Sequence, residues 1–108
     1  MITILAVGEG ASELAAFGAG HPSVEIVAAS GAEDALDRLA RNRRIDAVLI
    51  LAEKGAPEIA ALIREEDPGA PPLYTLAQRG VEVPGAIRLA AAAGPEAAEE
   101  ILRKLAKP

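Results

Sequence analysis

The 108-residue sequence contains no cysteine and no tryptophan, and aromatic residues make up only 2% of it. Without cysteine, the chain cannot form disulfides, thiolate metal sites or a cysteine nucleophile. The shortage of rings disfavours nucleic-acid modules that stack bases on aromatic side chains. The net charge of −5 disfavours binding to a phosphate backbone. We therefore expect no nucleic-acid partner.

The sequence also lacks long apolar runs and a basic start. No apolar run approaches the roughly 20 residues that span a bilayer, and Met1-Ile2-Thr3-Ile4 has no basic region typical of a secretory signal. We expect a cytoplasmic chain without membrane association. The single histidine, His21, has no second histidine or cysteine with which to share a metal ion. We expect a loop histidine there, and neither a metal nor a cofactor.

Hydrophobic residues make up 51% of the chain, and their spacing predicts an α/β fold. Short apolar runs, typical of strands, alternate with amphipathic stretches. The runs are Ile2–Val7, Val24–Ala29, Asp46–Leu51, Leu73–Ala77 and Ile87–Ala92. Such alternation implies right-handed crossovers and a mainly parallel five-stranded sheet between two helical layers. We expect one domain that covers residues 1–108.

Helices are predicted over Ala11–Phe17, after Ser30, over Glu58–Glu66 and after Pro95. Gly18 and Gly20 are predicted to stop the first of them. Ser30-Gly31-Ala32-Glu33 has the form of a capping box, in which the Ser30 hydroxyl and the Glu33 carboxylate each accept a backbone N–H. The connection over Arg79–Gly85 is too short for an ordinary helix.

The order β-α-β-α-β-α-β-β-α resembles a response-regulator receiver domain of two-component signalling, with the CheY-like, flavodoxin-like fold. Four fragments carry the resemblance: Ile4-Leu5-Ala6-Val7, Ile45-Asp46-Ala47-Val48-Leu49-Ile50, Gly85-Ala86 and Gly94-Pro95-Glu96. The resemblance implies a three-layer sandwich with strand order 2-1-3-4-5. The receiver's fourth helix would be shortened or absent here.

The chemistry of that family is missing from the matching positions. The resemblance places the acidic Mg²⁺-binding pair on Gly8 and Glu9, and the phosphoryl-accepting aspartate on Leu51. It places the supporting hydroxyl on Ala77 and the lysine on Ala91. Leucine and alanine supply neither a nucleophile nor a metal ligand. We interpret the chain as a pseudo-receiver that is not phosphorylated and is not an enzyme.

A second register places the acceptor at Glu53, because the family often has a proline four residues after its aspartate and Pro57 occupies that place. Glu53 would then resemble a permanent stand-in for phospho-aspartate. The alternative is that Glu53 is a solvated loop residue.

A glycine-rich turn, Gly8-Glu9-Gly10-Ala11-Ser12, lies between the first strand and the first helix. Free amides around Gly8, Gly10 and Ser12 could bind an anion. The turn lacks the third glycine of a dinucleotide fingerprint and the Gly-Lys-Ser/Thr of a P-loop, so a tight structural turn is the simpler interpretation. A basic cluster at Arg38, Arg41, Arg43 and Arg44 is either a solvated helix end or a docking site for an acidic partner.

These observations favour a non-catalytic signalling or protein-interaction domain that resembles a receiver. The alternative function is a small-ligand or nucleotide-binding α/β domain that uses the Gly8–Ser12 turn, and an unrecognised enzyme comes third. The resemblance implies signalling through the face of the fourth helix, fifth strand and fifth helix. With that helix short, we predict that self-association or a protein partner covers Val81, Val83, Ile87 and Leu89.

Overall fold

A computed structural model of the chain describes residues 2–42, 44–51, 55–76, 83, 85–91 and 93–106. Strands and helices alternate along most of the chain. The strands are β1 (Ile2–Val7), β2 (Val24–Ala29), β3 (Ala47–Ile50), β4 (Leu73–Thr75) and β5 (Ile87–Arg88). The helices are α1 (Ala11–Ala19), α2 (Ala32–Arg41), α3 (Ala56–Glu66) and α4 (Gly94–Ala106).

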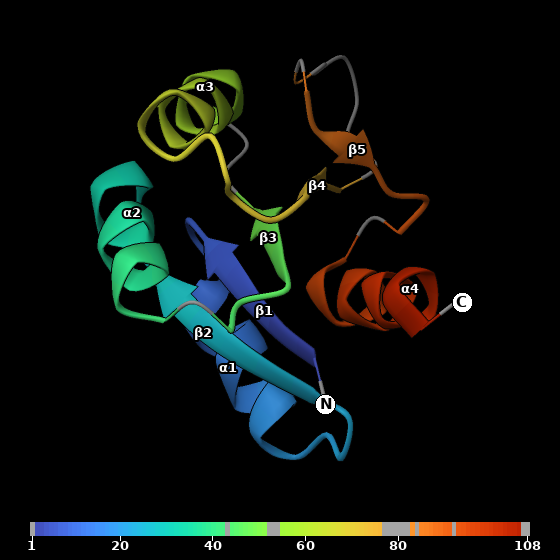
Figure 1. The fold of residues 1–108 in the computed structure, drawn as a ribbon. Helices are drawn as coiled ribbons and strands as arrows, with labels where there is room; N and C mark the ends of the chain where they lie inside the picture. Colours follow the sequence, from blue (N-terminus) through green and yellow to red (C-terminus); the bar gives the residue numbers. More distant parts are fainter. Residues whose placement is uncertain are drawn as a thin grey trace.

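The strands form one parallel sheet in the order β2-β1-β3-β4-β5, which confirms the predicted order (Figure 1). β1 lies in the interior of the sheet and pairs with β2 along its whole length, from Ile2 opposite Val24 to Val7 opposite Ala29. On its other side, Val7 pairs with Ile50 of β3. This register fixes which strand ends lie next to one another.

Helices cover both faces of the sheet, because alternate residues of β1 and β3 point to opposite sides. On one face, Ile4 and Leu49 pack in a cluster with Leu14 of α1 and Ile101 of α4. On the other face, a second cluster contains Leu5 and Val48 from the strands, Leu39 from α2 and Ile63 from α3. Burial on both faces explains why β1 and β3 are almost continuously apolar rather than alternating. The predicted three-layer α/β sandwich is therefore confirmed (Figure 1).

Two expectations about helix ends are wrong. The helix α1 does not stop at Gly18 but continues to Ala19, since Gly18 lies inside it against Ile26. Gly20, the other predicted stop, is the C-cap of α1 as expected. The capping box at Ser30 does not form, because Gly31 is the N-cap of α2 and no side chain caps that end. Instead, Asp34 accepts hydrogen bonds from the Ser30 backbone N–H at 3.0 Å and from its hydroxyl at 3.4 Å. The carboxylate one residue further along the helix has taken the place expected for Glu33.

The last two strands are shorter than predicted. β4 ends at Thr75 and β5 at Arg88, because β5 has a neighbour on one side only and pairs with just two residues of β4. The predicted short connection over Arg79–Gly85 lies outside the described residues, apart from Val83 and Gly85. None of the helices in the described part of the chain is long and apolar enough to cross a bilayer.

Candidate functional site

The carboxyl ends of the strands place four residues side by side in a row. The Leu51 N–H donates to Val7 O at 2.8 Å, and the Gly8 N–H donates to Ala29 O at 3.0 Å. At the other side of the sheet, the Leu89 N–H donates to Thr75 O at 2.8 Å. The residues that directly follow β1, β3, β4 and β5 are therefore neighbours at one edge of the sheet. This strand-end row consists of Gly8, Leu51, Leu76 and Leu89.

None of the four residues of the strand-end row has a polar or reactive side chain, so only their backbone groups could contact a ligand. Leu51 and Leu76 are each 9% exposed, and Leu89 is 2% exposed. Glu9 follows directly and is exposed, so it is the one carboxylate that the predicted pocket contributes among the described residues. The predicted pocket residues Glu53 and Ala77 lie outside the described part of the chain. Within that part, no group of three acidic or histidine side chains could hold a metal ion.

The resemblance implies a lysine at position 91, but this position is an alanine. The carboxylate of Glu100 lies against the backbone there. Both oxygens of Glu100, from α4, accept backbone hydrogen bonds: Oε2 from the Ala90 N–H at 3.1 Å and Oε1 from the Ala91 N–H at 2.9 Å. The bond from Ala90 holds the pKa of Glu100 below its usual value, and the bond from Ala91 acts in the same direction. Glu100 therefore fixes the segment between β5 and α4. The sequence did not reveal this role, because Glu100 resembles an ordinary acidic residue near a helix start.

The glycine-rich turn lines a cavity of about 880 Å³ between the beginnings of α1 and α2. Gly8 and Gly10 have φ values of 112° and 88°, a backbone conformation that favours glycine, so the tight turn explains both residues. Ser12 lies on the wall of the cavity, and no side chain caps the amides of α1.

The charges around this cavity oppose an anion. Three carboxylates line it, from Glu9, Glu13 and Asp34. Among the described residues, the one cationic side chain on its wall is Arg38, and it is already ion-paired with Asp34 at 3.4 Å. The backbone hydrogen bond from Ser30 lowers the pKa of Asp34, with a smaller contribution from Arg38, so this carboxylate stays charged. The uncapped backbone amides of α1 favour anion binding, but the three carboxylates would repel an anion. The negative charge therefore weakens the anion-binding hypothesis.

The predicted interface at the β4–β5 edge is wrong for two of its four residues. Leu89 is buried in the cluster beneath α1 and α4, and Val83, 9% exposed, is buried in the cluster beneath α2 and α3. Both side chains pack into the chain's own core and cannot form an exposed surface. Ile87 is 46% exposed, and Val81 lies outside the described residues.

His21 has a structural role in its loop. Its Nδ1 accepts a hydrogen bond from the Ser23 N–H at 3.0 Å, so its proton lies on Nε2. Nε2 lies 2.9 Å from Oε1 of Glu99 and donates to it. This contact joins the loop before β2 to α4. The centroid of the Phe17 ring lies 5.8 Å from the centroid of the imidazole.

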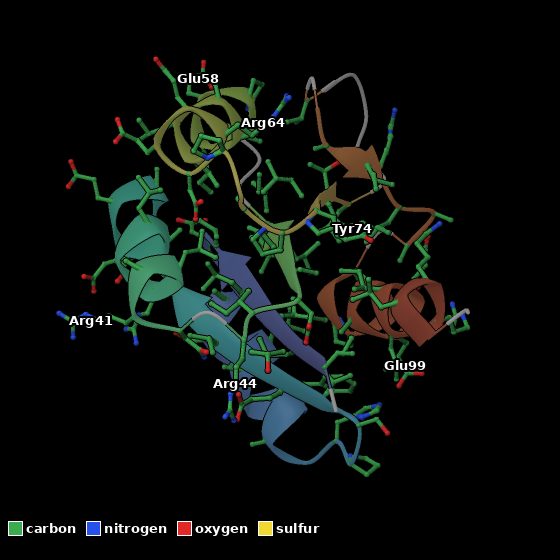
Figure 2. All side chains as sticks on the ribbon, in the orientation of Figure 1. Arg41, Arg44, Glu58, Arg64, Tyr74 and Glu99 are labelled. Carbon is green, nitrogen blue, oxygen red and sulfur yellow. The ribbon has the colours of Figure 1, made fainter. Side chains whose placement is uncertain are left out.

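The basic cluster is partly neutralised within its own helix. Arg38 pairs with Asp34, and Arg41 pairs with Asp37, each four residues away. Figure 2 shows the Arg41 and Arg44 side chains extending away from the ribbon, and both are exposed. Arg43 lies outside the described residues. This arrangement fits a solvated helix end.

The comparisons with known proteins concern the fold. No family model matches the sequence, and no curated protein matches it. The structure is similar to a chain from the crystal structure of the phosphorylated P1 domain of CheA3 in complex with CheY6 from R. sphaeroides. The TM-score is 0.70, the sequence identity is 21%, and the match covers 98% of each chain. At this identity the likeness shows a shared fold, the three-layer α/β sandwich with strand order 2-1-3-4-5.

Proposed function

We propose that the chain is a non-catalytic protein-interaction domain of two-component signalling, with a receiver-like fold that cannot be phosphorylated. The strand-end row carries this proposal. Phosphoryl transfer to a receiver needs a nucleophilic carboxylate, oxygen ligands for Mg²⁺ and donors for the phosphoryl oxygens. A buried leucine at position 51, between Gly8 and Leu76, supplies none of these.

The segment after β5 supports the same proposal. A phosphoryl group carries negative charge and is stabilised by an amine or by free backbone amides. Here the Ala90 and Ala91 amides are already bound by the Glu100 carboxylate. A carboxylate at this edge repels an incoming phosphate instead of attracting it.

The structural likeness supports the interaction part of the proposal. The matched chain comes from a complex of two proteins, the phosphorylated P1 domain of CheA3 and CheY6. A fold shared over 98% of both chains, combined with a pocket that has lost its reactive groups, favours a domain that acts by binding. Fold alone does not define function, so the proposal needs a direct test.

The test is intact-mass measurement after incubation with acetyl phosphate and Mg²⁺, with a phosphorylatable receiver treated in parallel as the positive control. We expect no phosphoryl adduct on this chain. A stable gain of one phosphoryl group, on Glu9, Glu53 or another residue of the sheet edge, would overturn the proposal. Thermal melting in millimolar Mg²⁺ adds a second measurement. A rise in melting temperature that Glu9→Ala abolishes would also contradict it.

A further inference from the structure

A second cavity, of about 910 Å³, lies on the side of α3 that faces β4 and the start of β5. We call it the α3 groove. One wall is α3, the other is the segment from Asp67 to Leu73, and Gly85 lies at its edge. Its apolar lining includes Pro57, Ala61, Pro68, Ala70, Pro71 and Leu73. The α3 groove is distinct from the strand-end row and shares none of its residues.

The α3 groove lies in the helical layer of α2 and α3. Leu73, which lines it, belongs to the same core cluster as Leu39 of α2 and Ile63 of α3. Helices packed side by side in such a layer lie about 8–10 Å apart. Ala61, exposed on the groove side of α3, has a small side chain that permits this approach. The site therefore suits another helix laid beside α3.

The rim of the α3 groove is acidic. Glu58 and Glu65 are exposed on α3 and line the groove. Within the described part of the chain, neither carboxylate has a hydrogen bond or an ion pair. They are seven residues apart, which places them about two turns, or roughly 10 Å, from each other along the helix. Two exposed carboxylates at this spacing favour a partner with two cations at a matching spacing.

Among the described residues, Arg64 is the one cation on the wall, and it lies at the edge of the groove. The guanidinium of Arg64 lies directly against Gly85, in the space that a β-carbon at that position would fill. Figure 2 shows the Arg64 side chain reaching from α3 towards the segment before β5. Asp67 is a third acidic residue on the wall, so the described lining residues carry more negative than positive charges.

We propose that the α3 groove binds an amphipathic α-helix of a partner protein, with an apolar stripe flanked by lysine or arginine residues two turns apart. The inference rests on the proposed function as an interaction domain, and it names the chemistry of the partner. The apolar stripe would cover Ala61 and Leu73, and the cations would pair with Glu58 and Glu65.

The probe is a synthetic helical peptide of about 14 residues, roughly four turns, with a leucine stripe and two lysines seven residues apart. A second peptide has glutamates in place of both lysines. Titration of the ¹⁵N-labelled full chain is followed by amide shifts in NMR spectra. We expect the lysine peptide to shift amides of α3, of residues 67–73 and of Gly85, and the glutamate peptide to bind more weakly.

Matched variants separate groove binding from general attraction between opposite charges. Glu58→Gln with Glu65→Gln should weaken the lysine peptide by about two- to fivefold for each charge removed. Glu13→Gln with Glu33→Gln makes the same charge change on exposed residues elsewhere and should leave binding unchanged. Ala61→Phe should fill the groove and abolish binding, whereas Ala16→Phe, on the exposed face of α1, should not.

Three results would overturn the inference: equal affinity for the two peptides, shifts outside the α3 groove, or binding that Ala61→Phe leaves intact. Sedimentation velocity of the free chain supplies a fourth. Self-association that Ala61→Phe abolishes would identify the occupant as a second copy of this chain and contradict a separate partner. If the peptides fail and acetyl phosphate still leaves the chain unmodified, the inference falls and the proposed function stands. A phosphorylated chain that still binds the lysine peptide in the groove would overturn the claim that the domain cannot be phosphorylated and leave its role in binding intact.

Discussion

Gly18 gives a stability test in which helix propensity and packing predict opposite signs. Alanine is a better helix former than glycine by about 1 kcal/mol, so propensity predicts that Gly18→Ala stabilises α1. The structure predicts the reverse. A β-carbon at Gly18 would lie 2.9 Å from Cγ1 and 3.0 Å from Cβ of Ile26. Ile26 is buried and belongs to β2, which holds it in place on the sheet.

Inserting a methyl group into a well-packed core costs about 1–3 kcal/mol. Subtracting the gain in helix propensity leaves a net destabilisation of about 1 kcal/mol. In a chain of this size, that lowers the melting temperature by about 4–8 °C. Gly20 is the matched control, because its φ is −95° and the nearest atom to a β-carbon there is Phe17 O at 3.8 Å. Gly20→Ala should be neutral or stabilising by about 0.5 kcal/mol.

The assay is reversible thermal and urea unfolding of the two variants and of a double-mutant cycle. Ile26→Ala removes Cγ1 and Cδ1 but keeps Cβ, so it relieves part of the crowding, and Gly18→Ala should cost less in that background than in the natural one. A Gly18→Ala variant that melts above the natural chain would refute the packing argument. Equal costs in both backgrounds would show that Cγ1 and Cδ1 of Ile26 are not the atoms responsible.

The remaining predictions concern polar contacts. Asp34→Asn should destabilise the chain more than Glu33→Gln, since Asp34 rather than Glu33 accepts from Ser30; urea midpoints of the two variants decide this. Glu100 has a lowered folded-state pKa, so its stabilising effect is present above its ordinary pKa and is lost as the pH falls through the folded value. The difference in urea midpoint between the natural chain and Glu100→Gln should therefore shrink from pH 7 to about pH 3, and a constant difference would contradict the role of the charge. Imidazole ¹⁵N shifts of the neutral form of His21 should show the proton on Nε2, whereas a proton on Nδ1 would be incompatible with the Ser23 hydrogen bond.

The strand order came from the resemblance to a receiver, whereas the hydrophobic pattern of the sequence predicted which segments form strands. Ile2–Val7 and Val24–Ala29 match the observed strands, since long pairing partners hold them along their whole length. The ends of the sheet were harder to predict. Leu89 and Ala91 continue the apolar pattern beyond the end of β5 at Arg88. The Leu89 N–H still donates to Thr75 O, and both side chains are buried in the cluster that contains residues of α4.

Individual side-chain contacts could not be predicted from local sequence patterns. The capping box failed because Glu33 and Asp34 are adjacent carboxylates, and helix geometry decides which one reaches Ser30. Nothing in the sequence near Ala90 indicates that Glu100 binds its amide. Val83 was predicted to be exposed because a helix was expected to be missing above it, whereas its side chain is buried in the core cluster beneath α2 and α3.

The interior position of β1 has a consequence for the rate of folding. Its nearest partner in sequence is β2, and the Thr3–Glu25 contact already spans 22 residues, while Thr3–Asp46 spans 43. No strand in the described sheet pairs with one joined to it by a short hairpin. Each pairing must close a long loop before it gains any contact, so this chain should fold more slowly than a helical bundle of equal length and stability. Because β1 joins β2 to β3, substitutions that slow its pairing should delay both halves of the sheet at once.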